Sequence, residues 1–300
     1  MKKIYISGCG GMLGAAFHKL FSQSYLVRCT DIDMNEPWLS YCDVRDYKGY
    51  KEDVLSFRPD YLFHLAALTD LEYCELHSDE AFMTNTIGSE NAVYISNELD
   101  IPLLYISTAG IFRGDQDYYD DWGEPSPMGH YAKSKYYAEI FVRENVRKHF
   151  ICRAGWMMGG GPKKDKKFVN KIVRQIKAGR VELDIVNDKF GTPTYTHDFA
   201  ASTKELIEND YYGLYNMACQ GLTSRFEVAG HIIKYLGLED KIRINTVNSD
   251  FFKKEYFAPR PFSECLINKR LELRGINLMG DWRKRLQEYL ENEFRAYLGL

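Results

Sequence analysis

The stretch K-I-Y-I-S-G-C-G-G-M-L-G, residues 3–14, decides the fold of this chain. Its first four residues, 3–6, are predicted to form a short buried strand, and glycines follow directly. An apolar pattern of helical period begins at Leu13 and continues to Phe21. Strand, glycine turn and helix in this order are typical of the first βα unit of a doubly wound α/β protein.

The glycine spacing of this unit predicts a dinucleotide site. Gly8 allows a tight turn, Gly11 lets a phosphate approach the backbone, and Gly14 lets the helix pack closely on the strand. Because a helix N-terminus attracts anions, Met12 and Leu13 are expected to contact the same group. Gly-x-x-Gly-x-x-Gly is the variant seen in short-chain dehydrogenases; the alternative is an ordinary turn with glycines for steric reasons.

A second predicted strand, residues 25–30, ends at Asp31. An acidic residue roughly 20 positions beyond the glycines is placed to accept both hydroxyls of a ribose. No arginine follows before Arg45, so the chain offers no obvious receiver for a 2′-phosphate. NAD(H) is therefore favoured as cofactor and NADP(H) is allowed, although Asp31 could merely open a polar loop.

Two further segments are expected to contact the cofactor. Asp43 and Val44 fit an adenine contact, with the Asp43 carboxylate accepting from the exocyclic amine; a simple loop aspartate is the alternative. Ala66 and Ala67 follow a predicted strand at 59–67 and are small where a cofactor needs close backbone approach. Plain core packing explains these alanines equally well.

Apolar strands alternate with helical segments through the first half. Further strands are expected at 103–108 and 151–154, with helices over about 77–98 and around Tyr131. Helical crossovers between short apolar strands imply a parallel, doubly wound α/β sheet of Rossmann type. In such sheets ligands gather at the carboxyl ends of the strands.

The chain is long enough for two lobes. Residues 1–155 are expected to form mainly the NAD(P)-binding Rossmann domain, and 156–300 mainly a smaller α/β substrate-binding lobe. Some segments of the second half are expected to return to the Rossmann sheet. Helices are predicted at 168–176, 224–236 and 281–297, with a strand near 213–217.

Tyr131 and Lys135 form the most specific chemical signal. They are four residues apart in a predicted helix, so both side chains emerge on one face. An ammonium beside a phenol is expected to lower the phenol pKa from about 10, which suits proton donation to a carbonyl undergoing reduction. Thr108, at the end of a predicted strand, could hydrogen-bond the same oxygen. A solvated helix face and a simple strand-end turn are the alternatives.

Composition excludes several classes of protein. An apolar share of 45%, a charged share of 27% and a net charge of −3 are ordinary for a globular protein and argue against a nucleic-acid partner. The seven cysteines are scattered without a Cys-x-x-Cys pair, so we expect buried thiols and neither a disulfide framework nor a metal site. No apolar run suits secretion or a membrane span. A cytoplasmic location is expected.

Motifs along nearly the whole chain carry a resemblance to a known family. They are G-x-x-G-x-x-G at 8–14, R-P-D at 58–60, A-A-L-T-D at 66–70, Asn85, S-T at 107–108, Y-x-x-x-K at 131–135, R-A-G-W at 153–156, F-G-T-P-T-Y-T-x-D at 190–198, R-P-x-S at 260–263 and K-R-L at 269–271. The chain resembles the extended short-chain dehydrogenase/reductases, and within them the dTDP-4-dehydrorhamnose reductase family. The C-terminal motifs separate this family from epimerases that share the N-terminal half.

The resemblance implies NAD(P)H-dependent reduction of the 4-keto group of a nucleotide-activated 6-deoxysugar. It implies that Tyr131 protonates the alkoxide, Thr108 hydrogen-bonds it, and Lys135 tunes the tyrosine and holds the cofactor. Trp156 would pack on or hydrogen-bond the sugar, and Arg260 could meet the diphosphate. As alternatives, Trp156 could be a core residue and Arg260 a surface charge. The Tyr-rich patches, Tyr118, Tyr119, Tyr211 and Tyr212, could face a sugar or could equally serve a homodimer interface.

The chain departs from the family next to Thr108. The family usually continues with Asp-Tyr-Val-Phe, whereas here Ala109-Gly110-Ile111-Phe112 follows. Related 4,6-dehydratases use an Asp-Glu pair at this place, and Ala109-Gly110 cannot do that chemistry. An epimerase of the same superfamily and a non-catalytic, cofactor-binding regulatory relative stay open.

A glycine-rich and then lysine-rich segment, G-G-G-P-K-K-D-K-K at 159–167, is expected to form a mobile loop over the mouth of the site. Its lysines could attract an anionic nucleotide, or they could form a solvated charge run.

Overall fold

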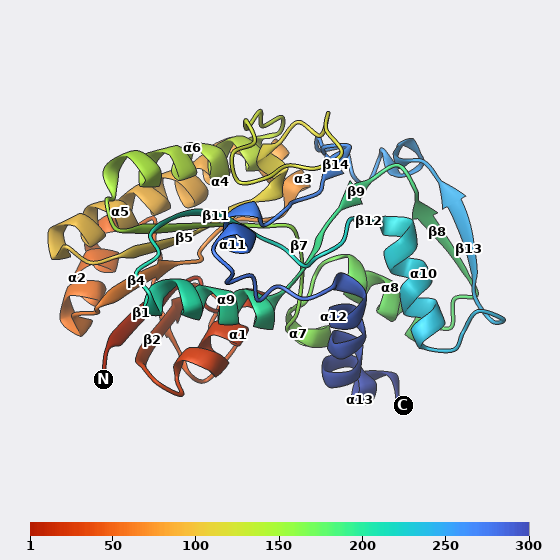
Figure 1. The fold of residues 1–300 in the computed structure, drawn as a ribbon, viewed down its shortest axis with the longest axis horizontal. Helices are drawn as coiled ribbons and strands as arrows, with labels where there is room; N and C mark the ends of the chain where they lie inside the picture. The colour runs from red at the N-terminus through yellow and green to blue at the C-terminus, as the bar shows by residue number, and fades with distance from the viewer. Residues whose placement is uncertain (300) are drawn as a thin grey trace.

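A seven-stranded parallel sheet forms the centre of the first lobe (Figure 1). The computed structural model describes residues 1–299; Leu300, the last residue of the expected second lobe, lies outside them. The strand order is β11-β6-β5-β4-β1-β2-β3, and every pairing is parallel. The strands are β1 (Lys3–Ser7), β2 (Leu26–Asp31), β3 (Leu39–Tyr41), β4 (Tyr61–His64), β5 (Leu103–Thr108), β6 (His149–Ala154) and β11 (Gly213–Met217). The predicted doubly wound Rossmann-type sheet is confirmed.

Helices cover both faces of the sheet (Figure 1). Side chains of β1 alternate between the two faces of the sheet. Ile4 and Ile6 enter the core under α1 (Met12–Phe21) and α9 (Thr196–Glu208), whereas Tyr5 enters a second core on the other face. That second core packs against α2 (Tyr47–Phe57), α5 (Gly88–Leu99) and α6 (His130–Asn145). Because both faces are buried there, the inner strands β1, β4 and β5 are largely apolar, whereas β2 nearer the sheet edge contains Arg28 and Asp31.

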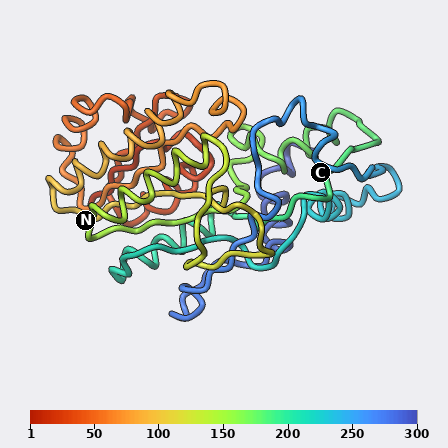
Figure 2. Tube along the Cα trace, turned by 90° about the horizontal axis from the view of Figure 1, so that it is seen from above, coloured from red at the N-terminus to blue at the C-terminus, as the bar shows by residue number. Residues whose placement is uncertain are grey.

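The second lobe has its own apolar core at the other end of the molecule, as Figure 2 shows. Its helices are α7 (Gly161–Lys164), α8 (Phe168–Lys177), α10 (Arg225–Tyr235), α12 (Trp282–Tyr289) and α13 (Arg295–Leu298). Its short strands are β7 (Trp156–Met158), β8 (Glu182–Val186), β9 (Phe190–Gly191), β10 (Pro193–Tyr195), β12 (Thr223–Ser224), β13 (Arg243–Val247) and β14 (Ser263–Glu264). These strands form small two- and three-stranded sheets.

Segments of the second half of the chain join the central sheet. β11 pairs with β6, α9 packs beside α1, and Leu271 of α11 (Lys269–Leu273) enters the same core. The lobe boundary at residue 155 itself stays a prediction.

Two predicted helices contain a π-helical turn. The helix expected at 77–98 is built from α4 (Ser78–Phe82), the π-turn η1 (Met83–Ile87) and α5, preceded by α3 (Leu71–Leu76). The helix expected at 281–297 is likewise α12, the π-turn η4 (Leu290–Phe294) and α13. Period alone could not reveal these turns, because one extra residue barely disturbs an apolar stripe.

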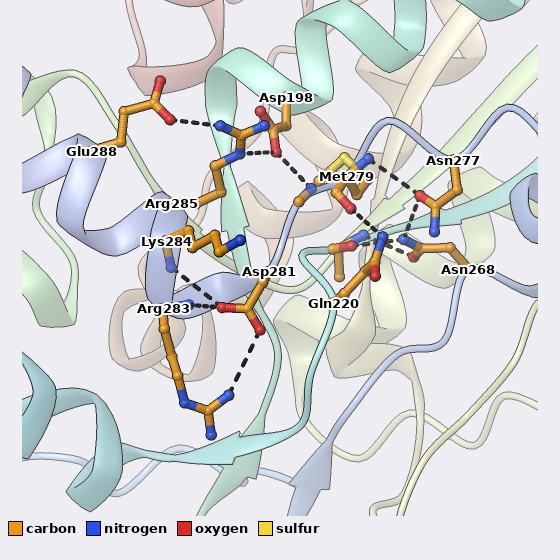
Figure 3. A network of polar contacts seen from close by, with 12 residues as sticks. Asp198, Gln220, Asn268, Asn277, Met279, Asp281, Arg283, Lys284, Arg285 and Glu288 are labelled. Atoms are coloured by element: carbon orange, nitrogen blue, oxygen red, sulfur yellow. Dashed lines mark hydrogen bonds and ion pairs between the residues drawn. The ribbon is translucent and has the colours of Figure 1, made fainter.

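A polar network joins the C-terminal segment to α9 (Figure 3). The Asp198 carboxylate on α9 accepts from the Gly280 N–H at 2.8 Å and from Arg285 Nε at 2.7 Å. Gln220 Nε2 donates to the Met279 carbonyl at 2.8 Å in the same view. Asp198 therefore connects the two lobes by hydrogen bonds, which is a structural role for the last residue of the 190–198 motif.

A buried ion pair joins α6 to the sheet. Arg153 on β6 and Glu139 on α6 are 2% and 1% exposed and lie 2.6 Å apart. The Ser107 hydroxyl on β5 donates to the same carboxylate at 2.5 Å. Three neighbouring elements therefore converge on one buried charge.

All seven cysteines are free and buried, as expected. Within residues 1–299, no group of three or more His, Cys, Asp or Glu residues is arranged to hold a metal ion. No helix in this described range is both long and apolar enough to cross a membrane.

Replacing Arg153 by Met should lower the free energy of unfolding by about 3–5 kcal/mol, because Glu139 would be left buried without its cation. Urea denaturation measures the change. The exposed pair Lys204–Glu208 on α9 provides the control: Lys204→Met should cost no more than about 0.5 kcal/mol. Equal losses of unfolding free energy in the two variants would show that the buried pair contributes no more to stability than the exposed pair.

Candidate active site

One cavity of about 1530 Å³ opens at the carboxyl ends of the central strands, between the sheet and the second lobe. Residues from both halves of the chain line it. All of the side chains and glycines predicted from the sequence as site residues are among them: Gly8, Gly11, Met12, Leu13, Gly14, Asp31, Asp43, Val44, Ala66, Ala67, Thr108, Tyr131, Lys135, Trp156 and Arg260. The structure therefore brings the whole predicted set to one place.

The glycine turn forms a cradle that fits a dinucleotide. Gly8 has φ +73°, and a Cβ there would lie 2.2 Å from the backbone nitrogen of Ala66. A Cβ on Gly14 would lie 2.1 Å from the Cys9 carbonyl, so both glycines are required sterically. Around Gly11, by contrast, a Cβ would meet nothing within 4 Å. Gly11 is also the N-cap of α1 and makes no side-chain cap, so the free N–H groups of the helix face the cavity.

Asp31 lies at the end of β2, beside the glycine turn. One carboxylate oxygen accepts from the Gly10 N–H at 2.8 Å and the other from the Asp33 N–H at 2.9 Å. A carboxylate accepts about four hydrogen bonds, so Asp31 keeps capacity for ribose hydroxyls. Its position at the cavity agrees with the predicted ribose contact.

Lysines from the second lobe reach this same end of the cavity, which the sequence did not reveal. Lys164 Nζ donates to the Gly10 carbonyl at 2.8 Å and to Asn35 Oδ1 at 2.9 Å. Lys163 Nζ lies 2.8 Å from Glu36 Oε1. The segment expected as a mobile loop thus includes a helical turn, α7, which is anchored to the first lobe by ion pairs. No local pattern could identify these contacts, since they join residues more than a hundred positions apart.

Asp43, which lines the same cavity, already forms an ion pair with Arg45. Its carboxylate pairs with Arg45, with Nη2 2.6 Å from Oδ2, and this cation holds the pKa of Asp43 below its usual value. Val44 beside it is buried and lines the cavity. An adenine amine would have to share the Asp43 carboxylate with Arg45.

Tyr131, Thr108 and Lys135 face the cavity from α6 and β5. Burial raises the pKa of Tyr131 to about 12, and a hydrogen bond with Thr108 opposes this shift. Lys135 is not among the groups that shift the pKa of Tyr131 here, so its lowering of the tyrosine pKa stays a prediction. The phenol stays protonated at neutral pH.

Lys135 is only 4% exposed, and its Nζ lies 4.2 Å from the centre of the Tyr105 ring. Burial lowers the pKa of Lys135 to about 7, and the charge of Glu139 acts in the opposite direction. The amine can therefore change its charge near neutral pH.

Asn85, at the centre of the π-turn η1, positions α6. Its Nδ2 donates to Ser134 Oγ at 3.0 Å and to the Leu68 carbonyl at 3.1 Å, and its Oδ1 accepts from the Leu68 N–H at 2.8 Å. These bonds join the helix that carries Tyr131 to the segment after Ala67. The π-turn directs this fully buried amide inward, which is a common use of such turns near functional sites.

Trp156 faces the cavity from β7 and is held on two sides. Its Nε1 donates to Glu264 Oε2 at 2.8 Å, and the Arg225 guanidinium lies 3.7 Å from its ring centre. Its indole N–H is therefore not free for a sugar, so of its two predicted roles the packing role fits the geometry. Neither Glu264 nor Arg225 was identified from the sequence. Glu264 directly follows the R-P-x-S motif at 260–263 but is not part of it, and no motif was recognised around Arg225.

Arg260 lines the cavity but carries a neutralised charge. Its guanidinium makes a two-bond pair with Glu72, at 2.7 and 2.9 Å. Arg225 differs: within residues 1–299 its guanidinium has no carboxylate at ion-pair distance. Burial lowers the pKa of Arg225 to about 10, so it is charged at neutral pH. Of Arg260 and Arg225, only Arg225 lacks a carboxylate partner among the described residues.

Comparison with known proteins identifies the family of this chain. The family model described as RmlD substrate binding domain matches residues 1–295. The spore coat polysaccharide biosynthesis protein SpsK of Bacillus subtilis is 29% identical over 99% of both chains. The dTDP-4-dehydrorhamnose reductase of Mycolicibacterium smegmatis is 28% identical over 96% of this chain and 84% of that protein.

Solved structures of similar proteins have the same fold. The dTDP-4-dehydrorhamnose reductase of Bacillus anthracis, solved in complex with NADP, is 30% identical with a TM-score of 0.88, covering 97% of this chain and 99% of that one. The enzyme of that name from Yersinia enterocolitica is 31% identical, with the same TM-score and the same coverage of both chains. The match over nearly the full length, together with the cavity described above, places this chain in the RmlD substrate binding domain family.

Proposed function

We propose that this protein is an NAD(P)H-dependent oxidoreductase that reduces the 4-keto group of a nucleotide-activated 6-deoxysugar. The observation that carries the proposal is the convergence of Thr108, Tyr131 and Lys135 on the cavity that also contains the glycine cradle. The relatives named dTDP-4-dehydrorhamnose reductase support the choice of substrate class. A product of this kind would serve polysaccharide biosynthesis, in agreement with the name of the Bacillus subtilis relative.

In the proposed reaction the nicotinamide, when bound, supplies a hydride to the carbonyl carbon. Tyr131 donates its phenolic proton to the alkoxide oxygen that forms. Thr108, which lines the same cavity, would orient the phenol by a hydrogen bond and can contact the same oxygen. Lys135 in its charged form would stabilise the phenolate left behind, and its pKa of about 7 lets it take up and release a proton in step with the tyrosine.

The substrate would lie along the second lobe. We propose Thr108, Tyr131 and Trp156 as its sugar contacts, with Arg260 farther out. The diphosphate would meet Arg225, because this buried guanidinium has no carboxylate partner and a planar fork binds phosphate oxygens well. Residues 1–155 would then serve mainly the cofactor and residues 156–300 mainly the sugar nucleotide.

At the cofactor end we propose a preference for NADH, since the Asp31 carboxylate can accept ribose hydroxyls and repels a 2′-phosphate. Lys163 and Lys164 supply positive charge a short distance away and make NADPH acceptable. A homodimer and a cytoplasmic location stay predictions.

Tyr131→Phe should lower the reductase rate at least about 100-fold, because the proton donor is lost. The assay is NADH absorbance after addition of dTDP-4-keto-6-deoxyglucose. Tyr137→Phe, an exposed tyrosine on the same helix, is the matched control and should keep full activity. Consumption of one NADH per sugar separates a reductase from an epimerase, which would show no net oxidation. Absence of turnover with several nucleotide-linked keto-sugars would favour a regulatory relative.

Gly11→Ala and Gly14→Ala should fail in different ways. Around Gly11 there is room for a methyl group, so the variant should keep its melting temperature but bind NADH at least about tenfold more weakly, because the methyl group occupies the phosphate approach. Gly14→Ala should lower the melting temperature, because its Cβ would meet the Cys9 carbonyl at 2.1 Å. Thermal unfolding and NADH fluorescence titration measure both effects. Unchanged NADH binding in Gly11→Ala would contradict the assignment of the cradle.

Asp31→Asn should change cofactor preference. The amide oxygen can still hold the Gly10 N–H, while the negative charge is removed, so the ratio of kcat/KM for NADH to that for NADPH should fall by about tenfold, equivalent to about 1.4 kcal/mol. Asp33→Asn, on an exposed neighbour, should leave the ratio unchanged. Lys164→Gln should raise the KM for NADPH more than that for NADH. A ratio that Asp31→Asn does not alter would refute the ribose assignment.

A further inference from the structure

The turn after β5 leaves a space next to Thr108. Ala109 and Gly110, in the 3-10 turn η2 (Ala109–Ile111), carry no polar side chain. A Cβ placed on Gly110 would lie 3.4 Å from Thr108 Oγ1 and 3.4 Å from Glu264 Oε1. A carboxylate from a remote strand, β14, thus fills the space that the small residues leave. The conclusion from the sequence that this place lacks a carboxylate holds for the turn itself, but not for the site.

The two oxygens of Glu264 have different surroundings. Oε2 accepts from the Trp156 indole at 2.8 Å. Oε1 has no hydrogen-bond partner within residues 1–299, and Glu264 lines the cavity. A residue that only held the tryptophan would need one oxygen. The second oxygen is therefore available to a ligand beside Thr108.

The position of this carboxylate is well defined. Ser263 and Glu264 pair with Phe190 and Gly191 of β9, so the backbone of β14 is held in register. The Arg225 guanidinium lies over the Trp156 ring, whose nitrogen bonds Glu264. The charges of Arg225 and Glu264 attract each other. Tyr131 and Cys265 are the other titratable groups that the Glu264 charge reaches. None of them neutralises Oε1 by a direct bond.

We propose that Glu264 Oε1 accepts a hydrogen bond from the hydroxyl on C3 of the sugar and so determines which keto-sugars are reduced. The inference rests on the proposed function. With the C4 oxygen at Thr108 and Tyr131, a group beside Thr108 faces a carbon next to C4. Of the two neighbours of C4 in a 6-deoxysugar, C5 carries a methyl group and the ring oxygen, and only C3 carries a hydroxyl donor. A carboxylate accepts hydrogen bonds and cannot donate them, so it suits C3 alone.

The test combines a variant with a substrate analogue. In Glu264→Gln the amide oxygen has to face the Trp156 N–H, which leaves the NH2 group facing the sugar and turns an acceptor into a donor. Kinetics are measured with the parent nucleotide 4-keto-6-deoxysugar and with its 3-deoxy analogue. A hydrogen bond to a charged group corresponds to about 10- to 150-fold in kcat/KM.

We expect the wild-type enzyme to prefer the parent sugar over the analogue by about that factor. In Glu264→Gln, kcat/KM for the parent sugar should fall by the same factor, and kcat/KM for the analogue should keep its wild-type value. The KM for NADH and the melting temperature should stay unchanged. Glu255→Gln, an exposed carboxylate on the rim of the same cavity, should match the wild-type enzyme with both sugars.

Equal losses for the parent and the analogue in Glu264→Gln would overturn the inference, since Glu264 would then act only through Trp156. Binding of the corresponding 4-hydroxy nucleotide sugars, with and without the C3 hydroxyl, is also measured by calorimetry for the wild-type protein and for Glu264→Gln. A protein that binds these sugars with the expected discrimination but reduces no keto-sugar refutes the proposed function and upholds the contact. A protein that binds neither sugar refutes both.

Discussion

The buried carboxylate of Glu139 is the constraint on which the arrangement of the site depends. It accepts from Arg153 on β6 and from Ser107 on β5, and it lies on the helix α6, one turn beyond Lys135. A buried ion pair adds little net stability, but either partner alone is strongly unfavourable inside a protein. The pair therefore allows few ways of docking α6. Helix and strands are held at the register that brings Tyr131 next to Thr108.

The same burial governs the proton chemistry. Loss of hydration raises the pKa of Tyr131 and lowers that of Lys135, so the two values are about 12 and about 7. A phenol that stays protonated suits a reductase, which has to deliver a proton to an alkoxide. A lysine near its pKa at neutral pH can balance the charge that the phenol leaves. Burial thus shifts the pKa values of the acid and of its partner in opposite directions, while the charge of Glu139 opposes the shift of Lys135.

Charge pairing distinguishes three arginines at the cavity. Arg45 and Arg260 are held by Asp43 and Glu72, so their charges serve mainly to fix the walls of the cavity. Arg225 stacks on Trp156 and keeps its charge available. Glu264, which accepts a hydrogen bond from the same indole, presents a negatively charged acceptor oxygen. A cation over the face of one aromatic ring and an acceptor at its nitrogen are well suited to a ligand with a phosphate end and a polyol end.

Local sequence determined the parallel sheet, the glycine cradle and the Tyr131–Lys135 face, because each depends on spacing within one or two elements. Asp31 and Thr108 followed from the rule that strand ends meet at one edge of the sheet. Only the tertiary structure decided that Lys164 reaches Gly10, that Glu72 neutralises Arg260, and that Glu264 and Arg225 enclose Trp156. These contacts join side chains from distant segments, and their pKa shifts come from burial. Neither the partner of a remote side chain nor its loss of water has a local pattern that the sequence displays.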